Sequence, residues 1–242
     1  MTNVIIIIPA YNEEKNIRAV IERIRKNIHF DLLVINDGST DRTPQIVEGL
    51  GEKVISLPFN LGYGGALQAG YKYVVEKDYE LVVQFDGDGQ HNPDDIFKLV
   101  QKFYGGDADI VIGSRFLAKN DYRPGFFRWT GIRLFSLLIY LITRLRVTDP
   151  TSGLQAVSRR AFEYYARKGN FPEDYPDADT LVQMILSGYR VAEIPAVMYP
   201  RKTGTSMHGG FKTIFYIAKV TLSIFAILLR IKLRMGVVGK CP

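Results

Sequence analysis

The stretch ELVVQFDGDGQ, Glu80 to Gln90, is the segment around which the chain is organised. It begins as an apolar run and ends in two acids, Asp86 and Asp88, that are followed by Gln90. Residues two apart share a face in an extended chain, and the glycines between these polar residues allow a tight turn. Two carboxylates and an amide oxygen suit Mg²⁺ or Mn²⁺, which complete their shell with water and phosphate. An ordinary polar loop with glycines would have the same sequence. Features elsewhere in the chain are therefore needed to distinguish a metal site from such a loop.

The composition is typical of one large α/β domain with an appendage. The chain has 242 residues, of which 47% are hydrophobic and 23% charged. Its one cysteine, Cys241, excludes an intrachain disulfide, which fits a reducing compartment. The apolar run from Val4 to Ile8 lacks a preceding basic region and a following small-residue cleavage site, so it indicates a strand rather than a signal peptide.

Positive charge is concentrated in the second half of the chain, whose net charge is +6. Arg115 to Arg146 contains several basic residues and one acid, Asp121, and Arg201 to Pro242 contains no acid. Such asymmetry predicts a face that meets anions. Because the basic residues alternate with long aliphatic and aromatic runs, they favour a membrane surface over nucleic acid, which we do not expect as a partner.

Apolar strands alternate with amphipathic helices over the first 115 residues. This pattern, with short connections, predicts an α/β fold with a mostly parallel sheet and helices on both faces. Ligands of such sheets bind beyond the carboxyl ends of the strands. PAYNEE follows the first strand, and no Gly-Lys-Ser/Thr occurs, so a dinucleotide fingerprint and a P-loop are both excluded. The expected strand ends carry Pro9 and a series of polar residues, namely Tyr11, Glu13, Asp37, Asn60, Asp86, Asp88, Ser114 and Arg115.

Two long apolar segments, 126–145 and 211–235, stand in the second half. Each has an uncharged core of ten residues, whereas a membrane span needs about 20. We therefore expect amphipathic helices that lie in the membrane interface and do not cross it. The alternative for the first is a buried helix, and the alternative for the second is a helix that packs on its own domain. The predicted domains are 1–210, which includes the first helix, and a C-terminal membrane-associating helix and tail, 211–242.

Six motifs occur in a fixed order: PAYNE, NDGSTD, FDGDGQ, IGSR, DPTSG and RKTGTS. In this order they resemble the family 2 glycosyltransferases of the GT-A fold, a Rossmann-like sheet. The resemblance is closest to the polyprenyl-phosphate sugar synthases, such as dolichyl-phosphate mannose synthase, and covers about residues 1–210. The D-x-D element alone is weak evidence, but six elements in the right order are specific.

The resemblance implies roles for individual residues. Asp86, Asp88 and Gln90 would bind the divalent cation, and Arg201 would neutralise the leaving diphosphate. The base and ribose of a nucleotide-sugar would be held by Pro9, Tyr11, Glu13, Asp37 and Asp86, with Asn36 replacing the first Asp of a common DDGS pattern. The acceptor phosphate would be held by Arg115, Arg128, Arg133 and Ser206, although Thr205 stands where many relatives have Lys.

Two kinds of acceptor are possible, and they differ in whether their nucleophilic oxygen needs a general base. A lipid monophosphate is mostly a dianion at neutral pH and needs cations to position it. A sugar hydroxyl needs a general base. Asp149 is a candidate to orient the acceptor or to act as that base, and the predicted catalytic set is Asp88, Arg115, Asp149 and Arg201. Asp177 and Asp179 are further candidate bases, although helix capping is the favoured interpretation, and His91 is interpreted as a turn residue.

The resulting hypothesis is an inverting, metal-dependent transferase that moves a sugar from a UDP- or GDP-sugar to polyprenyl phosphate for cell-surface glycans. Transfer to a sugar hydroxyl of a lipid-linked or polymeric glycan is the alternative, followed by a non-catalytic nucleotide-sugar-binding scaffold. We expect peripheral attachment to the cytoplasmic face of the membrane. A small membrane protein partner and a homo-oligomer both stay open.

Overall fold

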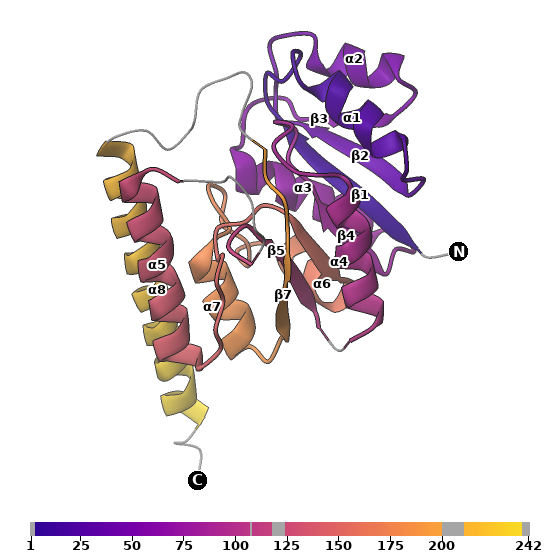
Figure 1. Ribbon diagram of the computed structural model, residues 1–242. Coiled ribbons are helices and arrows are strands. Elements are labelled where there is room, and N and C mark those ends of the chain that lie inside the picture. Colours follow the sequence, from indigo (N-terminus) through magenta and orange to yellow (C-terminus); the bar gives the residue numbers. More distant parts are fainter. Residues whose placement is uncertain (1–2, 107, 118–123, 200–210, 239–242) are drawn as a thin grey trace.

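The computed structural model describes residues 3–106, 108–117, 124–199 and 211–238, with side chains in the last range only for 214–232, and these form a sheet between two layers of helices (Figure 1). The described strands lie in the order β3-β2-β1-β4-β6-β5-β7. Neighbouring strands are parallel except at β6, which runs antiparallel to β4 and to β5. The strands are β1 (Val4–Ala10), β2 (Asp31–Asn36), β3 (Lys53–Ser56), β4 (Leu81–Gln84), β5 (Ile110–Ser114), β6 (Gln155–Ser158) and β7 (Val191–Pro195).

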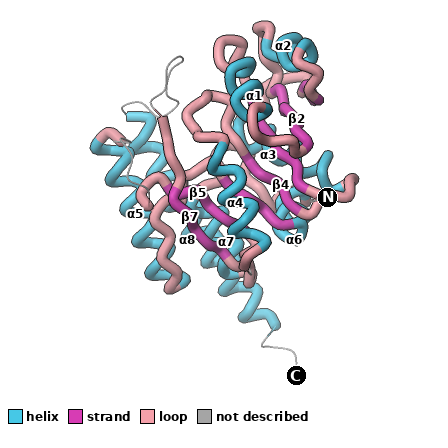
Figure 2. The backbone as a smooth tube through the Cα atoms, turned by 45° about the vertical axis from the view of Figure 1, so that its right-hand side comes forward, coloured by secondary structure: helices cyan, strands magenta, loops and turns pink. Residues whose placement is uncertain are grey.

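Helices cover both faces of the sheet (Figure 2). One hydrophobic cluster packs α1, α2 and α4 on one face, and a second packs α3, α5, α6, α7 and α8 on the other. The helices are α1 (Ile17–Arg25), α2 (Thr43–Gly49), α3 (Tyr63–Val75), α4 (Asp94–Tyr104), α5 (Phe126–Thr143), α6 (Arg159–Ala166), α7 (Ala178–Leu186) and α8 (Phe211–Val238).

The side chains of the first strand, β1, are buried on both faces of the sheet. Successive side chains of a strand point to opposite faces, so Ile5 and Ile7 join one cluster while Ile6 and Ile8 join the other. All seven residues of β1 are buried. A continuous β-branched run is therefore what a central parallel strand requires, because neither face meets water.

The predicted α/β fold with a mostly parallel sheet is confirmed, with two local differences. Strand β6 was not predicted, because its four residues QAVS follow a polar loop and lead directly into α6. The strand was predicted from the run Val4 to Ile8, yet β1 continues through Pro9 to Ala10. The ladder between β1 and β4 ends at Ile7, so Pro9 lies where only β2 still pairs with the strand.

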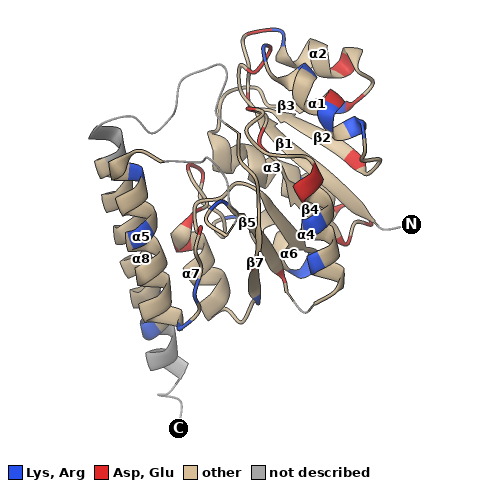
Figure 3. Cartoon of the chain, viewed as in Figure 1, with Lys and Arg blue, Asp and Glu red and all other residues tan. Residues whose placement is uncertain are grey.

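Helices α5 and α8 run side by side at one edge of the molecule, beyond α7 (Figure 1). Gly131 of α5 lies close to α8, since a Cβ atom there would come within 2.8 Å of Ile217. Figure 3 shows Lys and Arg positions and no Asp or Glu positions in the described parts of these two helices. Their large exposed apolar side chains include Phe126, Phe127, Leu137, Leu141, Phe215, Leu222, Phe225 and Leu229.

Both helices are long and apolar enough to cross a membrane, by length and composition alone. Phe126–Thr143 has a mean hydropathy of 1.3 and Ile214–Lys232 has one of 2.0. The expected interfacial position of these helices therefore stays a prediction, as does the division at residue 210.

Candidate functional site

A cavity of about 880 Å³ lies beyond the carboxyl ends of β1, β2, β4 and β5. Its position is the one that a mostly parallel sheet predicts, because the loops that follow these strands converge there. The cavity also reaches α5, α8 and the loop before α7. The predicted site residues that line it are Pro9, Tyr11, Glu13, Asp37, Asp86, Asp88, Gln90, Arg115 and Arg128.

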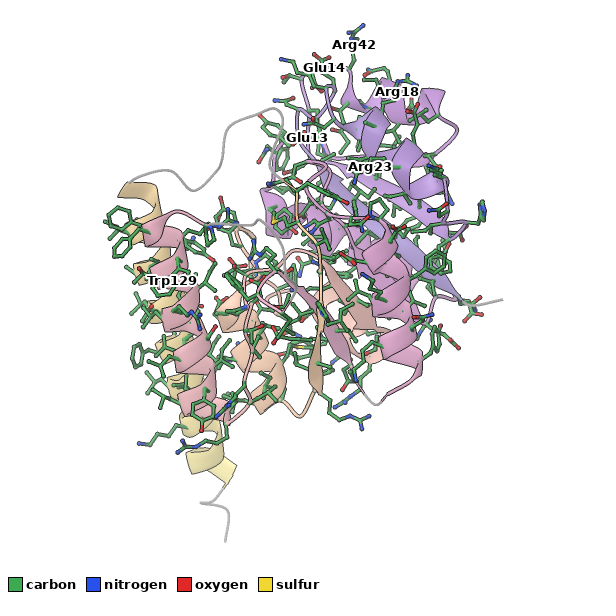
Figure 4. All side chains as sticks on the ribbon, viewed as in Figure 1. Glu13, Glu14, Arg18, Arg23, Arg42 and Trp129 are labelled. Carbon is green, nitrogen blue, oxygen red and sulfur yellow. The ribbon has the colours of Figure 1, made fainter. Side chains whose placement is uncertain are left out.

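The loops after β1 and β2 interlock at one end of the cavity. The Glu13 backbone N–H donates to Thr43 Oγ1 at 2.9 Å, and the Glu14 N–H donates to Asp41 Oδ2 at 3.0 Å. Figure 4 shows Glu13 and Glu14 where these loops meet. These backbone hydrogen bonds therefore fix the loop that carries Tyr11, a residue that is 47% exposed.

Asp37, at the end of β2, is buried and holds the turn that leads to α3. Its two carboxylate oxygens accept from the backbone N–H groups of Leu61, at 2.7 Å, and Gly62, at 3.0 Å. Burial raises the pKa of Asp37, and these two hydrogen bonds oppose that rise. Gly38 has a φ of +68°, and a Cβ atom there would come within 2.7 Å of the Phe59 backbone, so only glycine fits.

Asp86, just beyond β4, is held by two side chains. Tyr63 Oη donates to Asp86 Oδ1 at 2.8 Å, and His91 Nε2 lies 3.0 Å from Asp86 Oδ2. Gly153 packs against the same carboxylate, since a Cβ atom there would lie 2.6 Å from Oδ2. Burial alone would raise the pKa of Asp86, but the His91 and Tyr63 hydrogen bonds and the charge of Arg115 outweigh it and lower that pKa.

Asp88 and Gln90 form the turn that follows. Asp88 Oδ1 accepts from the Gln90 backbone N–H at 3.0 Å, and Gly89 between them has a φ of +76°. Gln90 Nε2 donates to the Tyr199 carbonyl at 3.2 Å. Among the described residues, no three His, Cys, Asp or Glu side chains lie close enough to hold a metal ion by themselves. The donor set of Asp86, Asp88 and the Gln90 amide oxygen fits a hard cation that takes further ligands from a diphosphate and water.

Arg115, at the end of β5, forms a buried ion pair with Asp149. Its Nε and Nη2 atoms donate to the two carboxylate oxygens at 2.6 Å each, and Nη2 also donates to Thr151 Oγ1 at 2.7 Å. Glu193 of β7 holds the Asp149 turn by accepting from the backbone N–H groups of Thr148 and Asp149. Arg115 lines the cavity, whereas Asp149 does not, so the acid orients the guanidinium from behind.

The far end of the cavity is built by α5, α8 and the loop before α7. Arg128, Asp177 and Tyr216 line it, and Tyr216 donates a hydrogen bond to Asp177. Burial raises the pKa of Asp177 to about 7, against the Tyr216 hydrogen bond, which lowers it. Asp177 was expected to cap α7, but its side chain makes no capping hydrogen bond. Asp179 lies in the first turn of α7 and accepts from Ser223 of α8.

Two of the predicted site residues that the structure describes do not line the cavity, Asp149 and Arg133. Arg133 is exposed on α5, with its guanidinium 5.4 Å from the ring centroid of Trp129, which lies on the outer side of the helix (Figure 4). Arg201 and Ser206 lie outside the described residues. Every assigned role therefore stays a prediction.

Three residues of the site were missed by sequence reasoning. Tyr63 and Tyr216 are aromatic residues in helical segments, and nothing in their spacing distinguishes them from core residues. His91 follows the D-x-D-x-Q motif directly, which was the available signal. Its contact with Asp86 could not be inferred, because it depends on how the turn folds back.

Comparison with known proteins agrees with this geometry. The family described as Glycosyl transferase family 2 matches residues 5–166. UDP-N-acetylglucosamine–dolichyl-phosphate N-acetylglucosaminyltransferase of Methanococcus voltae is 30% identical, over 87% of this chain and 92% of that protein. Polyprenol monophosphomannose synthase of Mycolicibacterium smegmatis is 27% identical, over 85% of this chain and 81% of that protein.

A solved structure has the same fold. The crystal structure of glucosyl-3-phosphoglycerate synthase from Mycobacterium tuberculosis, in complex with Mn²⁺ and UDP-glucose, superposes with a TM-score of 0.63 and 21% identity, over 95% of this chain and 78% of that one. At that identity the likeness concerns the fold alone. Because the family match covers more than half of the sequence, the chain belongs to glycosyl transferase family 2 and is a glycosyltransferase.

Proposed function

We propose that this glycosyltransferase moves a sugar, with inversion, from a UDP- or GDP-sugar to polyprenyl phosphate at the cytoplasmic face of the membrane, for cell-surface glycans. The observation that carries the proposal is one cavity with two unlike ends. Asp86 and Asp88 lie at one end, and Arg128 lies at the other, beside the apolar helices α5 and α8. The names of the two relatives, which specify dolichyl phosphate and polyprenol, support a lipid phosphate as the acceptor.

The donor end suits a nucleotide diphosphate. Pro9, Tyr11, Glu13 and Asp37 line the part of the cavity where the base and ribose would lie. Asp86, Asp88 and Gln90 would hold Mg²⁺ or Mn²⁺, which when bound supplies positive charge to the leaving diphosphate. The Mn²⁺ in the neighbouring crystal structure is consistent with this assignment.

The acceptor end suits a phosphate that needs no general base. A phosphate monoester oxygen would form the new bond to the anomeric carbon while the bond to the diphosphate breaks. The chain then has to position the acceptor, and Arg115 and Arg128 line the cavity for this task. Because Asp149 binds Arg115 through both oxygens, we assign Asp149 to positioning that guanidinium. Arg201 would neutralise the departing diphosphate, and Ser206 would assist with phosphate binding.

The second candidate function is transfer to a sugar hydroxyl, and Asp177 is the observation that favours it. Its carboxyl group lines the cavity, and its pKa of about 7 suits a general base at neutral pH. The Asp177→Asn variant separates the two functions. Loss of a general base costs about 10²–10⁴-fold in turnover, whereas the phosphate route retains its rate.

The proposed attachment to the membrane is peripheral, through α5 and α8. Their exposed faces carry large apolar side chains with Arg and Lys nearby, the combination that lies at headgroup depth on anionic lipid. Residues 211–242 form the membrane-associating unit in this proposal. A small membrane protein partner and a homo-oligomer remain predictions.

The test is an assay of the purified protein with Mn²⁺ and a panel of UDP- and GDP-sugars, in which undecaprenyl phosphate and a lipid-linked glycan are offered in parallel as acceptors. The proposal expects a lipid-linked monosaccharide with at least one donor. A sugar that appears only on a lipid-linked glycan supports the second function instead, and no transfer with any donor contradicts both.

A further inference from the structure

We propose that Tyr63 and His91 are positioning residues, which hold the Asp86 carboxylate in the orientation that the divalent cation requires. The inference rests on the proposed metal site. Neither residue belongs to the D-x-D-x-Q motif. Tyr63 is the first residue of α3 and precedes the motif in the sequence, whereas His91 follows the motif directly. Each donates to a different oxygen of Asp86, so the carboxylate is fixed at both atoms.

The start of α3 fixes the position of Tyr63. The backbone N–H groups of Gly64 and Gly65 donate to the carbonyl oxygens of Asp174 and Glu173, at 2.8 and 2.9 Å. A Cβ atom on Gly64 would lie 2.1 Å from the Pro172 carbonyl oxygen, so this close approach requires glycine. The first turn of the helix is therefore attached to the loop that precedes α7, and the Tyr63 hydroxyl reaches Asp86 from a rigid support.

His91 is buried, with 2% of its surface exposed, and Asp86 is its side-chain hydrogen-bonding partner. The carboxylate accepts, so Nε2 carries the proton, and Nδ1 is a buried atom with no partner among the described residues. A buried polar atom without a partner is unfavourable, yet the ring is kept there, edge-on to Phe85. An isolated β-bridge to Met198 fixes its backbone. The hydrogen bond to Asp86 is thus the polar interaction that the buried imidazole makes with another side chain.

Gly153 lies close beside the carboxylate. A Cβ atom at this position would lie 2.6 Å from Asp86 Oδ2 and 2.7 Å from Tyr63 Oη, so only glycine fits while Asp86 and Tyr63 keep these positions. A carboxylate that ligates a metal is itself usually hydrogen-bonded, and loss of such a partner typically costs 10–100-fold in metal affinity or activity. Tyr63 and His91 have this relation to Asp86.

The experiment measures Mn²⁺ binding directly by electron paramagnetic resonance, without nucleotide and with saturating UDP. The variants are Tyr63→Phe and His91→Gln, each of which removes a donor and keeps most of the side-chain volume. The matched controls are Tyr73→Phe, on the same helix away from the cavity, and His29→Gln, which is exposed. Thermal unfolding by circular dichroism sets a temperature at which every variant is folded. UDP binding in EDTA, by calorimetry, reports on the site without metal.

We expect the Mn²⁺ dissociation constant to rise about 10–100-fold in both variants and to stay unchanged in both controls. UDP binding in EDTA should not change in any of them. Unchanged Mn²⁺ binding in both variants overturns the inference, as does an equal loss of Mn²⁺ binding and of metal-free UDP binding, which indicates a general structural role. Absence of Mn²⁺ binding by the unaltered protein overturns the proposed metal site itself, so the two failures are distinguishable.

Discussion

Arg115 and Asp149 form a buried pair in which Arg115 Nε and Nη2 each donate to a different oxygen of Asp149 at 2.6 Å. Both side chains are at least 95% buried, because their exposed fractions are 3% and 0%. This pair joins the end of β5 to the DPTSG loop, which are two of the six sequence motifs. An ion pair at such depth is sensitive to the loss of one partner, because the other is left as an uncompensated charge.

Replacement of Asp149 by Asn should therefore destabilise the protein strongly. The expected loss in the free energy of unfolding is about 3–5 kcal/mol, measured by urea denaturation at pH 7. The control is Glu22→Gln, which breaks an exposed pair with Arg18 on α1 and should change stability by at most about 0.5 kcal/mol. Similar losses in both variants would show that burial of the Arg115 pair has no special effect.

The carboxyl group of Asp177 should make stability depend on pH. Burial raises its pKa to about 7, whereas an unfolded chain has a value of about 4. Between these values the unfolded chain has lost a proton that the folded chain keeps. The contribution of Asp177 to the free energy of unfolding therefore falls as the pH rises through this window and levels off above about pH 7.

Urea denaturation at pH 4.5, 6 and 8 measures this effect. In Asp177→Asn the fall between pH 4.5 and 8 should be smaller than in the unaltered protein. Asp78→Asn, in an exposed loop, is the control and should retain the full fall. Parallel pH profiles for the unaltered protein and Asp177→Asn would refute the assigned pKa.

A methyl group at position 153 should disturb the donor end of the cavity. In Gly153→Ala the new Cβ atom meets Asp86 and Tyr63 at under 3 Å, so one of these side chains has to move. We expect a loss of about 1–3 kcal/mol in the free energy of unfolding and a lower rate of sugar transfer. Gly49→Ala, where nothing lies within 4 Å of the added atom, should be neutral in both measurements. Full activity of Gly153→Ala would contradict the packing described for Asp86.

Membrane attachment should depend on the exposed face of α8. Phe225 is 59% exposed there, and burial of a phenyl ring in lipid is worth about 1.5–3 kcal/mol. Flotation on anionic liposomes at low salt should therefore weaken about tenfold or more in Phe225→Glu. Phe97→Glu alters an exposed phenylalanine of α4, on the other face of the sheet, and should leave flotation unchanged. No flotation of the unaltered protein at low salt would contradict peripheral attachment.

The α/β fold was predictable because its signals are local. Runs such as Val4 to Ile8 fix a buried strand by composition, and the spacing of Ile17, Val20, Ile21 and Ile24 fixes the buried face of α1. Strand β6 gave no such signal. Its four residues become a strand only because β4 and β5 pair with it from either side, and those strands lie far away in the sequence.

The candidate site was predictable where a motif carries it and not where packing does. Asp86, Asp88 and Arg115 stand at strand ends, and the cavity brings them together as expected. Arg133 satisfied the same pattern of basic residues, but the rotation of α5 turns it toward Trp129 and away from the cavity. Tyr216 reaches Asp177 only because α8 packs against α7, a contact that no short-range pattern predicts.

The acceptor assay tests the central claim most directly. Undecaprenyl phosphate and an undecaprenyl-diphosphate-linked sugar are offered in parallel as acceptors, with Mn²⁺ and the same nucleotide-sugars. The masses of the lipid products are measured by mass spectrometry. Asp88→Ala, which removes a proposed metal ligand, should lose about 10²-fold or more of the transfer rate, and Asp94→Ala, an exposed residue of α4, should retain it. The account predicts that undecaprenyl phosphate gains the mass of one sugar. Extension of the lipid-linked sugar alone, with undecaprenyl phosphate unchanged for every donor, would contradict it.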